Sequence, residues 1–167
     1  MTQRTAADIL KLPNSLNGHA IAASLLTSLA LSIITIGLVA PVGGFYQYFV
    51  LIAAGPATIV HHITIICLLC KHCDETTKTP LVPTCLTCTT NIGFMALFEL
   101  IWLAGTAVGF WLYALYHEST DMNILPGLAI TSNIVGLLQC FVFSALIVFC
   151  IRARNERSQA GRELGLA

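Results

Sequence analysis

Three ionisable side chains lie inside long apolar segments of this chain, at positions that suit either proton exchange or a bond between two helices. Glu99 lies in the run 92–116, and His61 and His62 lie in the run 48–70. If both runs are antiparallel membrane helices, all three side chains lie about 12 Å deep from the same side of the bilayer. A buried acid at that depth costs about 2.5–3.5 kcal/mol, so it should face a partner and not lipid. We therefore predict that Glu99 hydrogen-bonds to His61 or His62.

The polar cluster around these three residues has two interpretations. Helical spacing places Thr106 on the Glu99 face, and it places Thr58 with His61 on one stripe. Asn133 and Gln139 supply a matching polar stripe from the run 124–151. The cluster either fixes the register of the helices, at about 0.6 kcal/mol per bond, or forms a path for protons or cations.

Two Cys-x-x-Cys pairs lie between the end of the second apolar run and the start of the third. They are Cys70 with Cys73 and Cys85 with Cys88. Four thiolates at such spacing can close a tetrahedral zinc site. Cysteines beside a membrane span are also targets of reversible S-palmitoylation. Zinc binding, acylation and free thiols remain alternatives, and we expect no other cofactor.

No catalytic motif stands out in the sequence. It holds no Gly-x-Ser-x-Gly, no phosphate-binding loop and no His-Glu-x-x-His. The one acid within the apolar runs has no second acid beside it. We therefore expect no enzymatic activity.

Four long apolar runs must position these residues. They cover 20–40, 48–70, 92–116 and 124–151, and about 20 apolar residues suffice to cross a bilayer as a helix. Only 10% of the residues are charged, against about 25% in soluble domains. The first run is too long for the core of a cleaved signal peptide, so it reads as a retained span. We predict an all-α membrane protein, a single antiparallel bundle of four transmembrane helices.

The charges of the connecting segments predict the orientation of this bundle. Basic residues occur only in the tail 1–19, the loop 71–91 and the tail 152–167, whereas the connection 117–123 is acidic. The basic residues are Arg4, Lys11, Lys71, Lys78, Arg152, Arg154, Arg157 and Arg162. Cytoplasmic segments retain Lys and Arg, so both termini and the loop 71–91 should be cytoplasmic. We expect a multi-pass protein of the plasma membrane or an endomembrane.

The basic C-terminal tail also predicts partners. Arg152, Arg154 and Arg157 can attract anionic lipid of the inner leaflet, at about 1 kcal/mol for each residue near the surface. The net charge is zero, which argues against a nucleic-acid partner. The expected partners are membrane lipids, further copies of the chain or other membrane proteins.

Small residues recur at helical spacing in three of the runs. Ser24, Ser28 and Ser32 are spaced by four, Gly105 and Gly109 form a GxxxG pair, and Gly136 lies on the polar stripe of the last run. Small residues allow two helices to approach closely. Such contacts serve packing inside the bundle or association between copies, and we favour packing inside the bundle.

The third run carries a family resemblance. Its stretch Phe98-Glu99-Leu100-Ile101-Trp102-Leu103-Ala104-Gly105 resembles the third span of fungal MARVEL-domain proteins, and the likeness extends over residues 18–152. Four spans, cytoplasmic tails, small outer loops and the basic Arg152-Ala153-Arg154 end also resemble that family. The resemblance implies a membrane-organising protein that associates laterally with lipids and with other copies, in membrane apposition, vesicle traffic or membrane microdomains.

Overall fold

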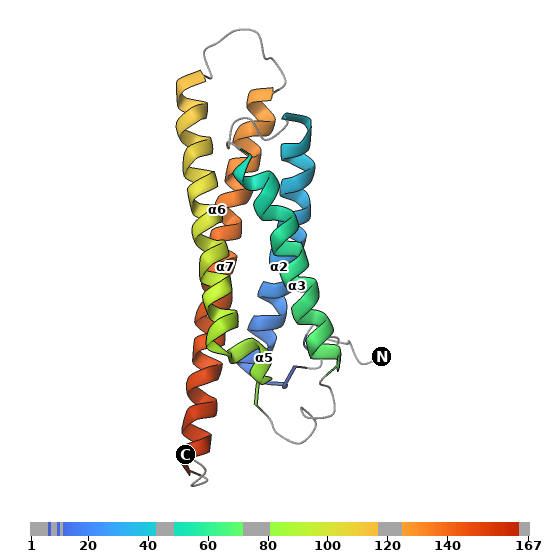
Figure 1. Cartoon of the computed structure of the whole chain (residues 1–167), viewed down its shortest axis with the longest axis vertical. Coiled ribbons are helices and arrows are strands. Elements are labelled where there is room, and N and C mark those ends of the chain that lie inside the picture. The colour runs from blue at the N-terminus through green and yellow to red at the C-terminus, as the bar shows by residue number, and fades with distance from the viewer. Residues whose placement is uncertain are drawn as a thin grey trace.

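The chain folds into four long helices that stand side by side (Figure 1). The computed structural model describes residue 7, residue 10 and residues 12–42, 49–71, 81–116 and 125–163. These residues are almost entirely helical and include no strand. The elements are α2 (Leu16–Val39), η1 (Ala40–Val42), α3 (Val50–Lys71), α5 (Thr84–Thr87), α6 (Thr89–Tyr116) and α7 (Leu125–Glu163). Since α2, α3, α6 and α7 are each long and apolar enough to cross a bilayer, the predicted all-α membrane bundle is confirmed.

Each long helix packs against two neighbours. Helix α2 contacts α3 and α7, and α6 contacts the same two helices from the opposite corner. The chain runs up and down alternately, so that α2 begins and α7 ends at the same end of the bundle (Figure 1). This arrangement is a four-cornered antiparallel bundle in which the first and last spans lie side by side.

Local chemistry fixes the start of α2. Ser15 is extended, and its Oγ accepts a hydrogen bond from the backbone N–H of Gly18 at 3.1 Å, which caps the helix. A side chain at position 18 would meet the carbonyl oxygen of Pro13 at 2.1 Å, so the close approach of this turn requires glycine. The helix therefore begins at Leu16, ahead of the predicted start of the first span.

The N-terminal segment is more than the polar tail that the sequence suggested. Its described apolar residues are buried in the core together with side chains of the 81–87 segment and of α7. These N-terminal residues are Ala7, Leu10 and Leu12, which are 1%, 4% and 7% exposed. The apolar core of the bundle therefore continues into this end, beyond the predicted spans.

Helix α7 is longer than predicted. The predicted fourth span ends at residue 151, but the helix continues through Glu163. Ala153, only 2% exposed, packs into the core, and Arg157 Nη1 donates to the carbonyl of Val82 at 3.3 Å. The added residues favour helix and include no proline, and these contacts hold them against the 81–87 segment.

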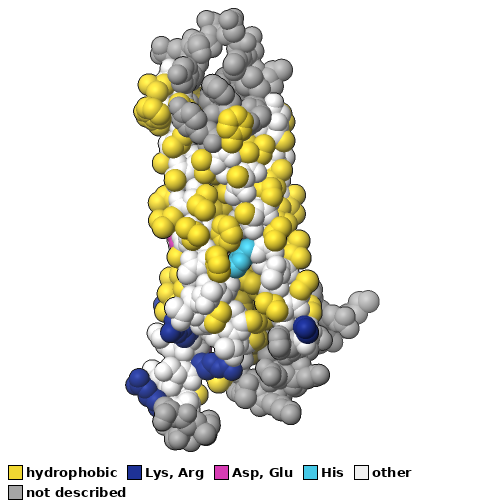
Figure 2. All heavy atoms as spheres, in the orientation of Figure 1, with side chains coloured by type: hydrophobic (Ala, Val, Ile, Leu, Met, Phe, Trp, Pro, Cys, Tyr) yellow, Lys and Arg dark blue, Asp and Glu magenta, His cyan; other side chains and the backbone are white. Residues whose placement is uncertain are grey.

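Charge and hydrophobic surface are separated along the bundle. The described basic residues lie at the end from which α7 extends, while hydrophobic side chains cover the length beyond it (Figure 2). Exposed large apolar side chains occur on every long helix, among them Ile33, Val60, Leu100 and Phe141. An apolar surface of this extent matches lipid as its solvent. We refer to the end from which α7 extends as the basic end.

Candidate functional site

Polar side chains in the middle of the bundle join its helices in a closed sequence. Gln139 on α7 donates from Nε2 to Ser28 Oγ on α2 at 2.6 Å, and more weakly to Ser32 Oγ at 3.3 Å. Gln139, Ser28 and Ser32 are all fully buried. These bonds connect the first span to the last, which no short loop connects.

The same serine joins α2 to α3. Ser28 Oγ lies 2.7 Å from His62 Nε2, and His62 is fully buried against Phe143, with ring centroids 5.6 Å apart. Ser28 is thus shared by an amide and an imidazole from two different helices. Because Ser28 has a single hydroxyl proton, it can donate to only one partner at a time.

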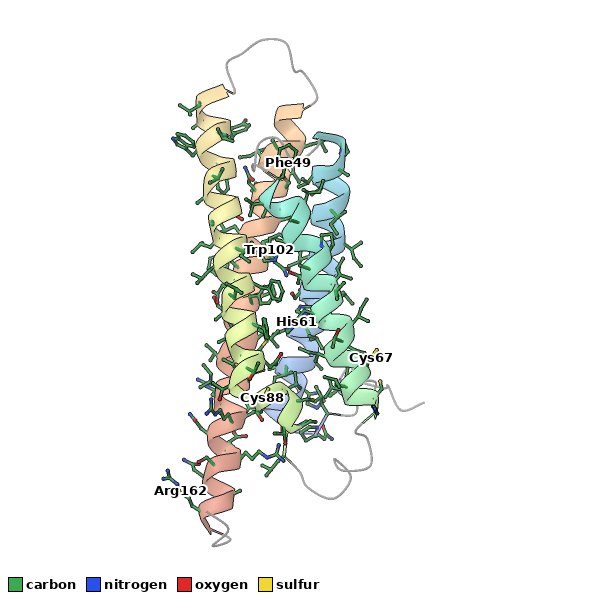
Figure 3. The ribbon with its side chains drawn as sticks, viewed as in Figure 1. Phe49, His61, Cys67, Cys88, Trp102 and Arg162 are labelled. Atoms are coloured by element: carbon green, nitrogen blue, oxygen red, sulfur yellow. The ribbon has the colours of Figure 1, made fainter. Side chains whose placement is uncertain are left out.

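Helices α3 and α6 are joined by a tryptophan. Trp102 is fully buried, and its Nε1 donates to Thr58 Oγ1 at 3.0 Å (Figure 3). Thr58 and His62 are both buried, four residues apart on α3, whereas His61 is half-buried. Thr58 and His61 both contact α6, whereas His62 contacts α2.

Glu99 joins α6 to α7. Its Oε1 accepts a hydrogen bond from Ser144 Oγ. Neither histidine donates to Glu99, so the predicted bond between Glu99 and His61 or His62 is wrong. Depth along the bilayer was a poor guide, because the direction of each side chain around its helix axis decides the partner. Glu99 points toward α7, while His62 points toward α2.

His61 of α3 packs against α6. Its ring lies 5.3 Å from the ring of Phe98 and 6.4 Å from that of Phe94, between centroids. Its Nε2 is buried without a hydrogen-bond partner. The labelled side chain lies at mid-height between the two helices in Figure 3.

Four cross-helix hydrogen bonds therefore close a circuit around the bundle. We call this set the polar ring: Gln139–Ser28, Ser28–His62, Trp102–Thr58 and Ser144–Glu99. Each of the four neighbouring helix pairs contributes one of these bonds. Thr58, named above on the stripe with His61, belongs to the ring together with Trp102 and Ser144. The i, i+4 spacing of Thr58 and His62 is the signal that points to them.

The polar ring is not fully satisfied. His62 Nδ1 and Gln139 Oε1 are buried and have no hydrogen-bond partner, and the same holds for Thr106 Oγ1. Whichever ring nitrogen of His62 carries the proton, Nδ1 lacks either an acceptor or a donor. Unpaired polar atoms in a dry interior are costly, so these atoms mark where a proton, an ion or water would be held most favourably.

The small residues lie at helix contacts inside the bundle. A side-chain carbon at Gly109 would lie 2.1 Å from Asn133 Oδ1, and one at Gly136 would lie 2.6 Å from Thr106 Oγ1. Gly105 packs against Leu51 of α3 in the same way, at 2.7 Å. Gly105, Gly109 and Gly136 therefore each receive a side chain from a neighbouring helix.

The serine stripe of α2 also faces inward for most of its length. Ser28 and Ser32 are fully buried, and Ser24, one turn earlier, is half-buried. Ser32 Oγ additionally donates to the carbonyl of Ser28 at 2.9 Å, within its own helix. The stripe therefore combines close packing with the hydrogen bonds of the polar ring.

The cysteine pairs divide into different environments. Cys70 is exposed at the end of α3, and Cys73 lies outside the described residues. Cys88 Sγ accepts the N–H of Asn91 at 3.4 Å and donates to the carbonyl of Cys85 at 3.6 Å, so it caps the start of α6. Burial raises the pKa of the Cys85 thiol. Among the described residues no three metal-ligating side chains come together, and zinc binding and acylation stay predictions.

The arginines proposed to meet lipid differ in their contacts. The Arg152 guanidinium lies 5.8 Å from the centroid of the Phe149 ring, and Arg154 is exposed. Arg157 is half-buried and bonded to Val82. Arg152 also lines an open cleft of about 370 Å³ between the start of α2 and α7.

The fold and this interior define a four-span integral membrane protein. No family model matches the chain, and neither a curated protein nor a solved structure matches it. The resemblance to fungal MARVEL-domain proteins thus rests on the residues quoted above.

Proposed function

We propose that this chain is a non-enzymatic membrane protein that organises the surrounding membrane through lateral contacts with lipid and with other helices, as the family resemblance implies. The observation that carries this proposal is the polar ring. Most of its polar side chains are occupied with one another, so they hold four helices in one register. A bundle held in this way offers its apolar outside as a fixed surface for lateral contacts.

The outer surface supports the same proposal. Leu100 on α6, Phe141 on α7 and Val60 on α3 are 63%, 65% and 64% exposed, on three different helices. Large exposed side chains of this kind pack against lipid chains or against the spans of a neighbouring protein. The chain therefore has apolar contact surface on several sides.

Site-specific photo-crosslinking tests this proposal. A photoreactive phenylalanine analogue at position 100 or 141 should yield crosslinked assemblies in native membranes. The same analogue at Met95, which is fully buried, should yield none. Crosslinks from neither exposed position, together with uniform dispersal of labelled monomers, would contradict the proposal.

A second candidate function is proton- or cation-coupled transport. The observation that favours it is the set of unpaired buried atoms in the bundle interior, His61 Nε2, His62 Nδ1 and Gln139 Oε1, together with the partly buried acid Glu99 on α6. Intramembrane Glu and His suit proton relay. Reconstitution in liposomes with a pH-sensitive dye tests it, with Glu99→Gln and His62→Gln as variants. Proton flux that is lost in both variants would support transport. Proton flux that Glu99→Gln leaves unchanged would contradict this candidate function.

A further inference from the structure

The cleft at the basic end lies where a lipid headgroup would lie. One wall is the first turn of α2, where the apolar segment begins at Leu16, and the other wall is α7 just past the apolar segment, at Arg152. Leu16 is 80% exposed at the mouth of the cleft, where lipid chains can cover it. The cleft therefore lies at the level where the bilayer changes from hydrocarbon to headgroups.

Opposite charges line this cleft. Arg152 supplies a guanidinium, which suits a phosphate because it presents several N–H donors in one plane. Glu156, one helical turn further on the same wall, supplies a carboxylate. Its Oε1 accepts a hydrogen bond from Asn17 Nδ2 at 2.7 Å, which spans the cleft and fixes the carboxylate in place. Its second oxygen accepts nothing from the described residues.

Neutral groups complete the lining. The side-chain amides of Asn155 and Gln159 face the cleft with both donors and acceptors. The backbone N–H groups of Leu16 and Asn17 are the first two of α2, so they have no acceptor within the helix. These N–H groups add partial positive charge on the side of a bound phosphate.

We propose that this cleft binds the headgroup of a phospholipid that carries both a phosphate diester and a primary ammonium, as phosphatidylethanolamine does. Arg152 and the start of α2 receive the phosphate, and the carboxylate of Glu156 receives the ammonium. A choline headgroup fits less well because its trimethylammonium donates no hydrogen bond. A purely anionic headgroup meets the carboxylate of Glu156 with like charge. This inference deepens the proposed function by naming the lipid.

Lipid retention by the intact protein tests the inference. The detergent-purified chain is mixed with equal amounts of dioleoyl phosphatidylethanolamine, phosphatidylcholine and phosphatidylglycerol, and native mass spectrometry measures which lipid stays bound. We expect preferential retention of the ethanolamine lipid. Since a charge-assisted hydrogen bond is involved, Arg152→Gln should weaken it roughly tenfold. Equal retention of all three lipids by the unaltered chain would overturn the inference.

Two further variants sharpen the result. Glu156→Gln keeps an oxygen for Asn17 but removes the charge, so it should erase the preference for ethanolamine over choline. Arg154→Gln changes an exposed arginine of the same helix outside the cleft lining, so it should leave retention unchanged. An equal loss from Arg154→Gln and Arg152→Gln would show nonspecific attraction to charge and reject the site.

The source of the headgroup and the link to the proposed function are tested separately. Soluble glycerophosphoethanolamine should fail to displace the bound lipid, and displacement at equal concentration would reject a lipid ligand. Crosslinked assemblies that persist without any ethanolamine preference would reject this inference alone. Dispersed monomers that keep the preference would reject the proposed function alone.

Discussion

The side-chain amide of Gln139 donates to the hydroxyl of Ser28, with 2.6 Å between Nε2 and Oγ. This bond joins the last span to the first, 111 residues apart in sequence. The other neighbouring spans are consecutive in the chain, or nearly so, and their connections hold them close. No loop joins α2 directly to α7, so this helix pair depends most on its side-chain contacts. The Gln139–Ser28 bond of the polar ring is one of them.

Removing the shared hydroxyl should therefore loosen the whole bundle. Ser28→Ala deprives Gln139 of its shorter bond and leaves His62 Nε2 without a partner. Unpaired buried groups cost about 1–3 kcal/mol in soluble proteins, and bonds within membranes are worth about 0.6 kcal/mol on average. We expect a loss of about 1 kcal/mol in the free energy of unfolding, measured by reversible denaturation in mixed micelles.

The matched control is Ser24→Ala, one turn earlier on the same stripe. Ser24 is half-buried and takes no part in the polar ring, so the same substitution should change the free energy of unfolding little. If both variants unfold alike, the ring contributes nothing beyond packing. A double-mutant cycle of Ser28→Ala with Gln139→Leu would give the coupling between the two residues directly.

Close contact of α6 with α7 leads to a second prediction. A side-chain carbon at Gly109 would lie 2.1 Å from Asn133 Oδ1, whereas one at Gly93 of the same helix meets nothing within 4 Å. Gly109→Ala should destabilise the bundle by about 1–3 kcal/mol, as overpacking does, because Asn133 must move. Gly93→Ala should be neutral or slightly stabilising. Thermal unfolding in detergent compares the two, and equal stabilities would contradict the packing.

The sequence predicted the spans well because apolar length is a strong signal in lipid. It also placed Glu99 and the two histidines at similar depth. The direction in which each side chain points from its helix was harder to predict from the sequence, since neighbouring positions such as His61 and His62 differ by about 100° around the helix axis. Choosing between them requires knowing which helix lies alongside, and that depends on the packing of all four spans.

The packing at the basic end could not be predicted for a related reason. Leu10 and Leu12 lie in a short apolar stretch of a polar tail. The end of α7 is rich in charged residues, which is typical of a solvent-exposed tail. Leu10, Leu12 and Ala153 are buried in one cluster with Val82 and Leu86 from the segment 81–87, so the burial of each depends on the others. Contacts between three distant segments of the chain leave no local pattern in the sequence, so they could not be predicted from it.

The two tryptophans provide a test of the bundle's orientation toward lipid. Trp102 is fully buried, while Trp111 on the same helix is 58% exposed. Lipids with brominated acyl chains quench tryptophan fluorescence on contact. We expect strong quenching in the Trp102→Phe variant, which keeps Trp111, and weak quenching in the Trp111→Phe variant. The opposite order would mean that α6 presents its other face to the bilayer.

The thiol of Cys85 should be slow to react at neutral pH. Its pKa is raised chiefly by burial, so less of it is the reactive thiolate than for an ordinary cysteine. In a variant that keeps Cys85 alone, the rate of alkylation by iodoacetamide should rise with pH and level off at a higher pH than for N-acetylcysteine. A rate that levels off at lower pH would contradict burial of the α5 segment and favour a thiolate site such as bound zinc, which metal analysis would then detect.

The end of α7 is held by contacts that can be removed one at a time. Arg157 Nη1 donates to the carbonyl of Val82 at 3.3 Å, while Arg154 is exposed. Arg157→Gln shortens the side chain and loses this bond, so both partners should open more often. Hydrogen exchange should quicken in residues 81–87 and in the last turns of α7, and stay unchanged in the spans, because local opening follows local contacts. Arg154→Gln should change neither region. If exchange at the end of α7 is fast in the unaltered chain, the helix beyond the membrane depends on its own propensity, and the cleft beside Arg152 loses the rigid wall that its ligand requires.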